Sequence, residues 1–273
     1  QQTLGVATRA LADLSRGTLT ELPPGPYGQL NVVSGTPGSP RIYRSQSRTN
    51  PAQVTSVNMQ GVHDVYILGL DIDNPSGTGI LAHGARDFVI AGNTIHAQYG
   101  IRALDSATNG YIADNVVQGE STWTEASLGA SGDNIGEGIE ISGPGNVVAY
   151  NRVRGFRDNI STLEFESNSG NQRSIDIHNN EILVSADDAI EADFAQGNVR
   201  VYDNRITDAF IGISTQPTLG GPTYILRNVM YNVANVPFKP NRFSDGDVIM
   251  HNTVVKAGSG LFTASGLAYS NAL

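Results

Sequence analysis

The sequence contains no cysteine and no long apolar run, and these absences narrow its function classes. Without cysteine, the chain has neither a disulfide framework nor thiol chemistry. No stretch approaches the roughly 18 consecutive apolar residues of a membrane-spanning helix, so we expect no membrane span. Basic residues are scarce, with 17 Lys and Arg against 26 Asp and Glu. The net charge of -9 argues against a nucleic-acid partner, which would normally require a basic face.

Aromatic residues are also sparse, whereas the residues that make turns are plentiful. Aromatic side chains make up 7% of the 273 residues, with a single tryptophan, while there are 31 glycines and 12 prolines. Together with abundant Asn, Val and Ile, this composition is typical of many short strands joined by tight turns. The chain starts at Gln1 without Met or an apolar leader, which fits either a mature secreted or cell-surface (extracellular or periplasmic) protein or a shortened chain.

An asparagine recurs along the chain at steps of 22 to 24 residues, with two longer steps of 36 and 29 residues. Each copy follows a short apolar strand and precedes another, a pattern that predicts a solenoid in which each repeat forms one coil. Stacked asparagines of this kind would pass amide hydrogen bonds from coil to coil, so we interpret them as a structural asparagine ladder. The asparagines are Asn93, Asn115, Asn151, Asn180, Asn204, Asn228 and Asn252.

The N-terminal segment differs from the repeats. Residues 6–14 place Val6, Ala10, Leu11 and Leu14 on one face at helical spacing, which predicts a short amphipathic helix. We expect this helix to cover the open end of the solenoid, whose terminal coil would otherwise expose apolar core and unpaired backbone groups. The expected organisation is a cap segment over residues 1–17 and one β-helix domain over residues 18–273.

The coil length, the asparagine series and the N-terminal cap resemble the right-handed parallel β-helix superfamily. The resemblance covers residues 18–273 and implies an all-β, right-handed parallel β-helix solenoid with a short N-terminal capping helix. The superfamily includes pectate lyases, polygalacturonases, alginate lyases and C5-epimerases. The resemblance therefore implies a polysaccharide or oligosaccharide as partner, although one fold can host many chemistries.

A second strand in each coil can be aligned from coil to coil, and its second position is always apolar. Alternation then directs the second and fourth positions into the core and the third and fifth positions outward. The inward residues at position two are Ile80, Ile101, Ile139, Leu163, Ile190, Ile213, Phe238 and Leu261.

Acidic residues gather in the outward columns of three consecutive coils. In this alignment Glu140, Glu164 and Glu191 stack at position three, with Glu166 and Asp193 beside them at position five. Crowding would raise the pKa of one carboxyl group while a neighbour stays ionised, as glycoside cleavage by an acid and a base or nucleophile requires. Coil spacing of about 4.8 Å allows either the retaining or the inverting separation. The alternative interpretation is an exposed acidic strip without function.

Asp187 and Asp188 resemble the paired aspartates of glycoside hydrolase family 28, the polygalacturonases. A glutamate of the preceding coil and Lys239, two coils downstream, are similar to that family's upstream aspartate and downstream lysine. Residues 212–214 read Gly-Ile-Ser where the family has Gly-His-Gly, and no Arg-Ile-Lys surrounds Lys239. The resemblance implies an acid or base role for Asp187 or Asp188. Alternatively, both could cap backbone N–H groups in a turn.

Candidate substrate-binding residues lie beside these carboxylates. Arg102, Asn241 and His83 fall in the outward columns. Trp123, in the long insertion at residues 118–136, could stack on a sugar face at the rim of a groove or pack the loop onto the solenoid. The five histidines are scattered over different coil positions, so we expect no metal cluster.

Three functions remain open from the residues. The leading hypothesis is an extracellular enzyme that cleaves a glycosidic bond without a cofactor, using two of the candidate carboxylates. A lyase or C5-epimerase would instead bind Ca²⁺ and abstract a proton with Lys239 or Arg102. A non-catalytic glycan-binding or surface solenoid is the third. The catalytic candidates are Glu140, Glu164, Glu191, Asp188 and Lys239.

Overall fold

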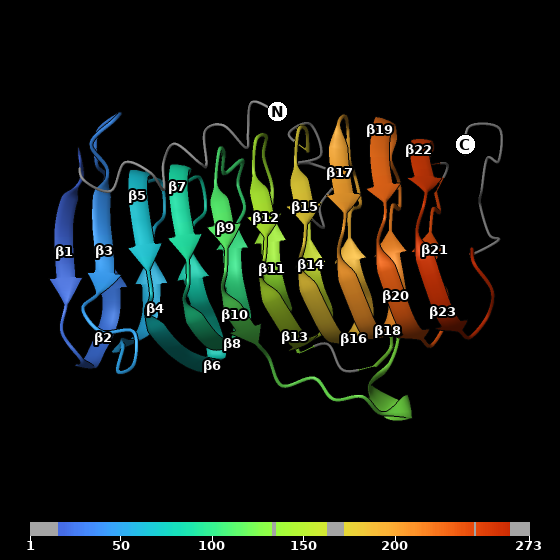
Figure 1. Ribbon diagram of the computed structural model, residues 1–273, viewed down its shortest axis with the longest axis horizontal. Coiled ribbons are helices and arrows are strands. Elements are labelled where there is room, and N and C mark those ends of the chain that lie inside the picture. The colour runs from blue at the N-terminus through green and yellow to red at the C-terminus, as the bar shows by residue number, and fades with distance from the viewer. Residues whose placement is uncertain (1–15, 133–134, 163–171, 243, 263–273) are drawn as a thin grey trace.

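The chain forms a parallel β-solenoid whose coils stack along one long axis (Figure 1). This computed structural model describes residues 16–132, 135–162, 172–242 and 244–262. Every pairing between its strands is parallel, which confirms the predicted all-β, parallel β-helix architecture. The helix expected over residues 6–14 lies outside the described residues. Within the described ranges, no helix has the length and apolar character needed to cross a membrane.

The first sheet receives one strand from each coil. These 10 strands are hydrogen-bonded in the order in which the chain visits them. They are β1 (Thr18–Leu22), β3 (Arg41–Ser45), β5 (His63–Leu68), β7 (Arg86–Ala91), β9 (Tyr111–Ala113), β12 (Val147–Ala149), β15 (Asp176–His178), β17 (Val199–Tyr202), β19 (Leu219–Leu226) and β22 (Asp245–Met250).

The second sheet has 13 strands, and some coils contribute two segments to it. Its main series is β2 (Gly25–Asn31), β4 (Ala52–Asn58), β6 (Asp71–Leu81), β8 (Thr94–Ala103), β10 (Val116–Gln118), β13 (Arg152–Phe156), β16 (Glu181–Glu191), β18 (Arg205–Ser214), β20 (Val229–Val233) and β23 (Thr253–Ala257). Beside it lie β11 (Glu137–Ile141), β14 (Asp158–Ser161) and β21 (Phe238–Lys239). The insertion before β11 contains a short 3-10 helix, η2 (Glu125–Ser127).

Columns of buried aliphatic side chains hold the coils in register. In the first sheet Ile67, Ile90 and Ile112 occupy equivalent positions on successive strands and are fully buried. Ile139, on β11, belongs to the equivalent column of the second sheet. A slip of one residue in any coil would turn such a side chain toward solvent, so these columns fix the registration of the outward-facing residues as well.

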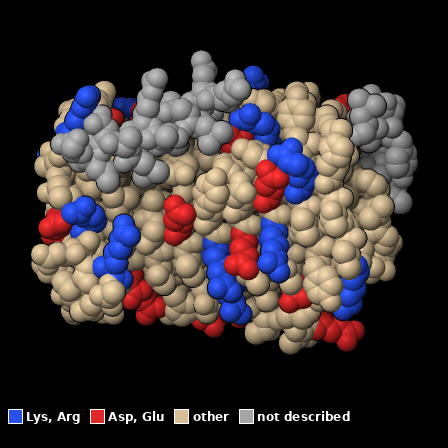
Figure 2. Space-filling view, viewed as in Figure 1, with Lys and Arg blue, Asp and Glu red and all other residues tan. Residues whose placement is uncertain are grey.

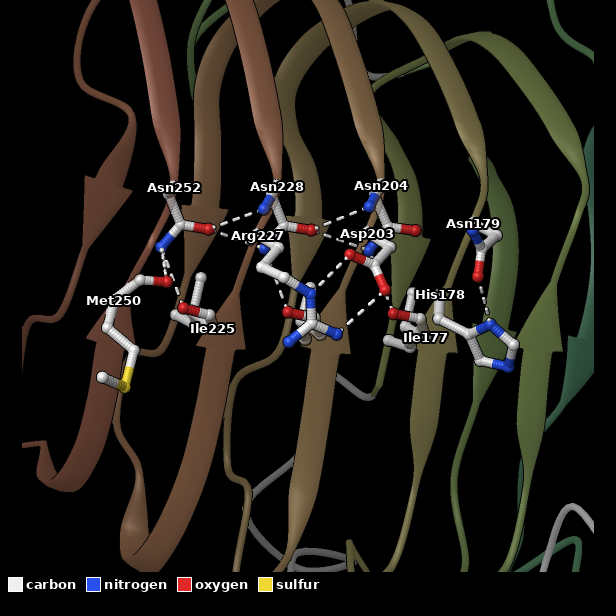
Figure 3. Close-up of polar contacts among 11 residues, drawn as sticks. Ile177, His178, Asn179, Asp203, Asn204, Ile225, Arg227, Asn228, Met250 and Asn252 are labelled. Carbon is white, nitrogen blue, oxygen red and sulfur yellow. Dashed lines mark hydrogen bonds and ion pairs between the residues drawn. The ribbon is translucent and has the colours of Figure 1, made fainter.

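The predicted asparagine ladder is present, and Figure 3 shows its C-terminal part. The ladder is buried except at its end, where Asn252 is half-buried. The side-chain amide of Asn180 donates to Asn204 Oδ1 at 3.0 Å, and the amide of Asn204 donates to Asn228 Oδ1 at the same distance. The backbone N–H of each asparagine from Asn93 to Asn228 donates to the same oxygen, as from Asn180 to Asn204. Each side chain therefore satisfies backbone groups that a buried turn would otherwise leave unpaired.

The residue just before each ladder asparagine has left-handed backbone geometry. Asp114, Tyr150, Asn179, Asp203 and others in this column have φ between 54° and 68°. This conformation turns the chain from one sheet into the next and directs the side chain outward. One such outward pair, Asp203 with Arg227, is visible below the ladder in Figure 3.

One coil departs from the sequence-based register. The strand expected at residues 162–167 begins earlier, as β14, so Ile160 takes the inward position predicted for Leu163. Ser161 consequently pairs with both Glu140 and Glu191, in the place predicted for Glu164. The predicted stack of three glutamates on consecutive coils is therefore wrong. An isoleucine followed by a serine fits the inward–outward alternation as well as the later leucine and glutamate do.

Several charged side chains on the outer surface lie beside a charge of opposite sign. On the face shown in Figure 2, many Asp and Glu side chains touch Lys or Arg. Pairs across neighbouring coils include Arg152 with Glu181 at 3.4 Å and Arg227 with Asp203 at 2.9 Å. Buried carboxylates gather at β14 and β16, where Asp158, Asp187 and Asp188 lie on two neighbouring strands.

Candidate functional site

Five acidic residues on β14, β16 and the turn after β16 form what we call the carboxylate cluster. Asp158 lies on β14, Asp187, Asp188 and Glu191 lie on β16, and Asp193 follows β16 directly. Four of them are buried, with exposed fractions between 1% and 5%, while Glu191 is half-buried. Four carboxyl groups of the cluster are thus removed from solvent, and the fifth, Glu191, remains open to it.

A bulge in β16 produces this arrangement. The pairing of β16 with β18 shifts register between Ser185 and Asp188, so two acidic residues follow each other near one strand position. The side-chain amide of Asn159, on β14, donates to Ser185 Oγ at 2.6 Å and holds the start of the bulge. The N–H of Asp187 donates to the backbone oxygen of Arg157 at 2.8 Å. Bulges of this kind commonly re-aim side chains at functional sites.

Lys239 on β21 reaches back over β18 to this cluster. Its Nζ atom lies 2.6 Å from Asp188 Oδ2, and both side chains are nearly buried. Ser214 is the residue on the intervening coil, between Glu191 and Lys239, and its small side chain leaves room for the lysine. Asp188 N–H donates to Asp158 Oδ1 at 2.7 Å. Among the described residues Asp188 Oδ1 has no hydrogen-bond partner, so it is left as an acceptor.

Glu191 and Asp193 form a carboxyl–carboxylate pair. Asp193 Oδ1 accepts hydrogen bonds from Ser214 Oγ and from the N–H of Gln216, each at 2.6 Å. A side-chain hydrogen bond between Glu191 and Asp193 also favours the ionised form of Asp193. Two carboxyl groups can share a hydrogen bond only if one is protonated. Burial and the charge of Asp193 raise the pKa of Glu191 well above its ordinary value, whereas the donors around Asp193 favour its ionised form, so the shared proton is assigned to Glu191.

Burial dominates the electrostatics of the cluster. Burial, reinforced by the charge of Asp187, raises the pKa of Asp158 to about 6. Burial likewise raises the pKa of Asp193 to about 6, although Lys239 and the hydrogen bonds oppose it. For Glu191, burial and the charge of Asp193 raise the pKa well above its ordinary value. The cluster can therefore hold a proton near neutral pH, as a general acid must.

These raised values predict that the protein becomes less stable as pH rises. Unfolded aspartate titrates near 3.8, whereas Asp158 and Asp193 titrate near 6 in the folded chain. Between these values the folded state retains protons that the unfolded state has lost. Below this pH range the stabilisation is fully present, and above it the stabilisation is lost. The free energy of unfolding therefore falls by on the order of 3 kcal/mol per group as pH rises through the range.

Urea unfolding followed across this pH window measures the effect. Asp158→Asn should flatten the curve, because the amide cannot titrate and its oxygen can still accept from Asp188 N–H. Asp87→Asn is the matched control, since Asp87 is exposed and its left-handed backbone suits asparagine. A free energy of unfolding that rises with pH across the window, or equal slopes in both variants, would contradict the assignment.

Other candidates from the sequence are placed differently. Glu140 is 2% exposed and forms a bidentate ion pair with Arg102, one coil away. The expectation that Glu140 projects into solvent is therefore wrong, and Ser161 separates it from Glu191. Glu164 and Glu166 lie outside the described residues. Catalytic roles for these three glutamates remain predictions.

The candidate binding residues surround the cluster to different extents. Asn241 donates its side-chain amide to Gln216 Oε1 at 3.1 Å, next to the turn that holds Asp193. His83 pairs with Asp105 at 3.0 Å, several coils away. Trp123 is half-buried in the insertion. That insertion returns to β16, where Gly129 N–H donates to the backbone oxygen of Ala186 at 2.7 Å, immediately before the paired aspartates.

Asp158 is the functional candidate that the sequence-based alignment missed. It lies one coil upstream of the paired aspartates, the place for which a glutamate was expected. The available signal was Asp158-Asn-Ile-Ser161, which fits the strand pattern if Ile160 is the inward residue. Arg157 was also missed; its guanidinium lies 3.4 Å from Asp187 and 3.8 Å from Asp158, at the edge of the cluster.

Comparison with known proteins adds a family to this geometry. Residues 69–257 match the model of the family described as periplasmic copper-binding protein (NosD). The matched span includes the whole carboxylate cluster and Lys239. No curated protein matches the chain.

Solved structures with the same architecture include carbohydrate-active enzymes. An alginate lyase from Paenibacillus sp. str. FPU-7 has 17% sequence identity and a TM-score of 0.64, with 95% of each chain covered. A family 28 exopolygalacturonase from Yersinia enterocolitica has 14% identity and a TM-score of 0.56, covering 94% of this chain and 62% of that chain. DFA-IIIase from Arthrobacter chlorophenolicus A6 has 12% identity and a TM-score of 0.54, covering 97% and 86%. At such identities the likeness shows the fold alone.

Proposed function

This chain belongs to the NosD family of parallel β-helix proteins, and on that scaffold we propose that it is an extracytoplasmic enzyme that cleaves a glycosidic bond of a polysaccharide. The observation that supports the proposal is the carboxylate cluster, in which a half-buried acid with a raised pKa adjoins carboxylates held by donors and a lysine. Two carboxyl groups in different protonation states are what glycoside hydrolysis needs. The periplasmic description of the family and the neighbouring carbohydrate-active enzymes agree with such a substrate.

In this proposal Glu191 is the general acid. It is the one member of the cluster with substantial access to solvent, and the pairing with Asp193 keeps its proton in place. It would protonate the oxygen of the leaving sugar as the glycosidic bond breaks. Burial raises the pKa of Asp188 well above its ordinary value, and Lys239 at 2.6 Å opposes this shift. With Lys239 in place, Asp188 would act as the ionised partner, as base toward water or as nucleophile, through its unpartnered Oδ1 atom. Lys239 would hold Asp188 in position and favour its ionised form.

The ion pairs argue against a lyase or epimerase that uses Lys239 or Arg102 as the base. Burial lowers the pKa of Lys239, but Asp188 and Asp193 outweigh burial and raise it above the ordinary lysine value. A lysine that keeps its proton cannot abstract another from a sugar carbon. Arg102 is bound by both oxygens of Glu140, and arginine does not deprotonate in proteins. Hydrolysis therefore agrees better with the residues present.

Metal chemistry finds no support in the residue arrangement. Copper sites favour His, Cys and Met, and Ca²⁺ takes six to eight oxygens. The described residues contain no group of three or more His, Cys, Asp or Glu that could hold a metal ion. The chain has no cysteine, and of its three methionines Met59 and Met230 are buried in the core while Met250 is exposed. We therefore derive no step through copper or calcium.

The products of a polysaccharide panel test this proposal. We expect new reducing ends without the ultraviolet absorbance of a sugar C=C bond, and unchanged rates in the presence of a chelator. Elimination would instead produce absorbing products, and epimerisation would leave chain length unchanged. Absorbing products would favour the lyase, and unchanged chain length with altered sugars would favour the epimerase. No turnover of any neutral or acidic polysaccharide would favour the non-catalytic glycan-binding solenoid. Each of these results would contradict hydrolysis.

A further inference from the structure

A hollow with two arginines lies on the outer surface, in coils that precede the carboxylate cluster. Its volume is about 540 Å³. Leu68, Leu70 and Ala91 supply apolar lining, and Arg44, Arg48 and Asp114 supply charge. We call this site the arginine hollow. It contains none of the residues assigned to catalysis.

Two glycines create the space. Gly69 and Gly92 occupy the left-handed turn position just before Leu70 and Asn93, with φ of 68° and 67°. The same position in later coils carries side chains as large as Tyr150 and Arg227, so its backbone does not require glycine. A Cβ atom on Gly92 would meet nothing within 4 Å, so packing does not require glycine there either. The hollow exists because these two coils lack the side chain that others have.

The hollow has two arginines on one coil and a single aspartate on a later coil. Arg44 is ion-paired with Glu21, and its side chain remains 43% exposed. Arg48 is exposed, and no hydrogen bond or ion pair of its side chain is found within the part of the chain that the structure describes. Asp114 is exposed and lies in the later coil, so a ligand would meet donors from the arginines and an acceptor from Asp114.

From this arrangement we propose that the arginine hollow binds a carboxylated sugar unit, such as a hexuronate, within an oligosaccharide. Arginine binds a carboxylate with two parallel hydrogen bonds. Asp114 can accept from sugar hydroxyls, and the leucines and Ala91 can contact the apolar C–H face of the ring. In this proposal the hollow anchors an acidic stretch of saccharide. It shares no residue with the carboxylate cluster, so it is argued from observations independent of the proposed hydrolysis.

The backbone argues against a general phosphate site. Phosphate sites typically offer free backbone N–H groups. Here the N–H groups of Gly69 and Gly92 already donate to the backbone oxygens of Ala91 and Ala113, both at 3.1 Å. Asp114 would also repel a doubly charged anion.

Calorimetric titration of the whole chain with tetragalacturonate tests the site. The titration is run on the wild type and on Glu191→Gln, so that binding is read separately from cleavage. Arg48→Gln removes the free guanidinium, and Gly92→Tyr fills the hollow with the residue that Tyr150 places in the same column. Arg205→Gln is the control, because Arg205 is exposed on β18, outside the hollow.

We expect both hollow variants to weaken binding at least roughly tenfold, while Arg205→Gln leaves it unchanged. The methyl ester of the same oligosaccharide should bind as weakly as the variants do, because it lacks the carboxylates. Absent wild-type binding, equal affinity for the ester, unchanged affinity in Arg48→Gln, or full competition by inorganic phosphate would each overturn the proposal. Binding that persists without hydrolysis of any substrate would leave this site standing and remove the proposed function alone.

Discussion

Glu191→Gln is expected to lower the rate of glycosidic cleavage by about 10²- to 10⁴-fold, the contribution typical of a positioned general acid. Glutamine has the size of glutamate and its amide can still donate a hydrogen bond to Asp193, but the amide is too weak an acid to transfer a proton to the leaving oxygen. Because the pKa of Glu191 is raised well above its ordinary value, the neutral amide resembles the form already present in the folded protein. The thermal midpoint should therefore not fall, and a steady-state assay reads the chemical loss directly.

Glu181→Gln provides the matched control. Glu181 lies on the same strand, β16, where its side chain is 44% exposed and pairs with Arg152 at the surface. Its replacement should leave the rate within about twofold, as for surface positions away from a site. Comparable rates for the two variants would remove Glu191 from the mechanism, and a loss in Glu181→Gln alone would place the chemistry elsewhere on the strand.

Lys239→Met is expected to destabilise the fold by about 3 kcal/mol or more above neutral pH, because it leaves Asp188 buried without its cation. Asp188 can respond by taking up a proton, since burial already raises its pKa well above the ordinary value. The destabilisation should therefore shrink as pH falls. Urea unfolding near pH 5 and near pH 8 measures both features.

A double-mutant cycle with Asp188→Asn separates the pair from the packing of the lysine stem. The double variant should recover most of the stability lost in Lys239→Met, because no charge then remains unpaired. Arg152→Met breaks an exposed pair on neighbouring coils and should cost less than about 1 kcal/mol. A pH-independent loss in Lys239→Met, or no recovery in the double variant, would show that the ion pair does not govern this part of the fold.

The repeating part of the fold was predictable because its causes are local. The ladder asparagine, the apolar strand on each side of it and the turn residue before it recur in nearly every coil. These features specify parallel stacking. The alignment of the second strand also predicted that Glu140 and Glu191 share one outward column, and the structure places Arg102, Ser214 and Lys239 in the same column. A stacked repeat copies its register from coil to coil, so one correct alignment propagates.

The candidate site was predictable only in part, because it lies where the repeat is interrupted. The bulge in β16 and the early start of β14 have no period, and Asp158 was missed for that reason. Burial was a second obstacle. Residues at outward-facing positions were expected to be exposed, yet Glu140 and Asp193 are almost fully buried. Their partners come from other coils, Arg102 for Glu140 and Ser214 for Asp193, and no single strand encodes those contacts.

The sequence by itself determined a coiled ribbon of parallel strands, since a short motif repeated at a regular interval can bury its apolar side chains only by stacking on its own copies. Tertiary structure alone decided which acids meet, which of them lose contact with water and which one keeps a proton. Those properties depend on distances between residues of different coils and on the protein atoms that surround each carboxyl group. Neither can be read from the order of residues along the chain.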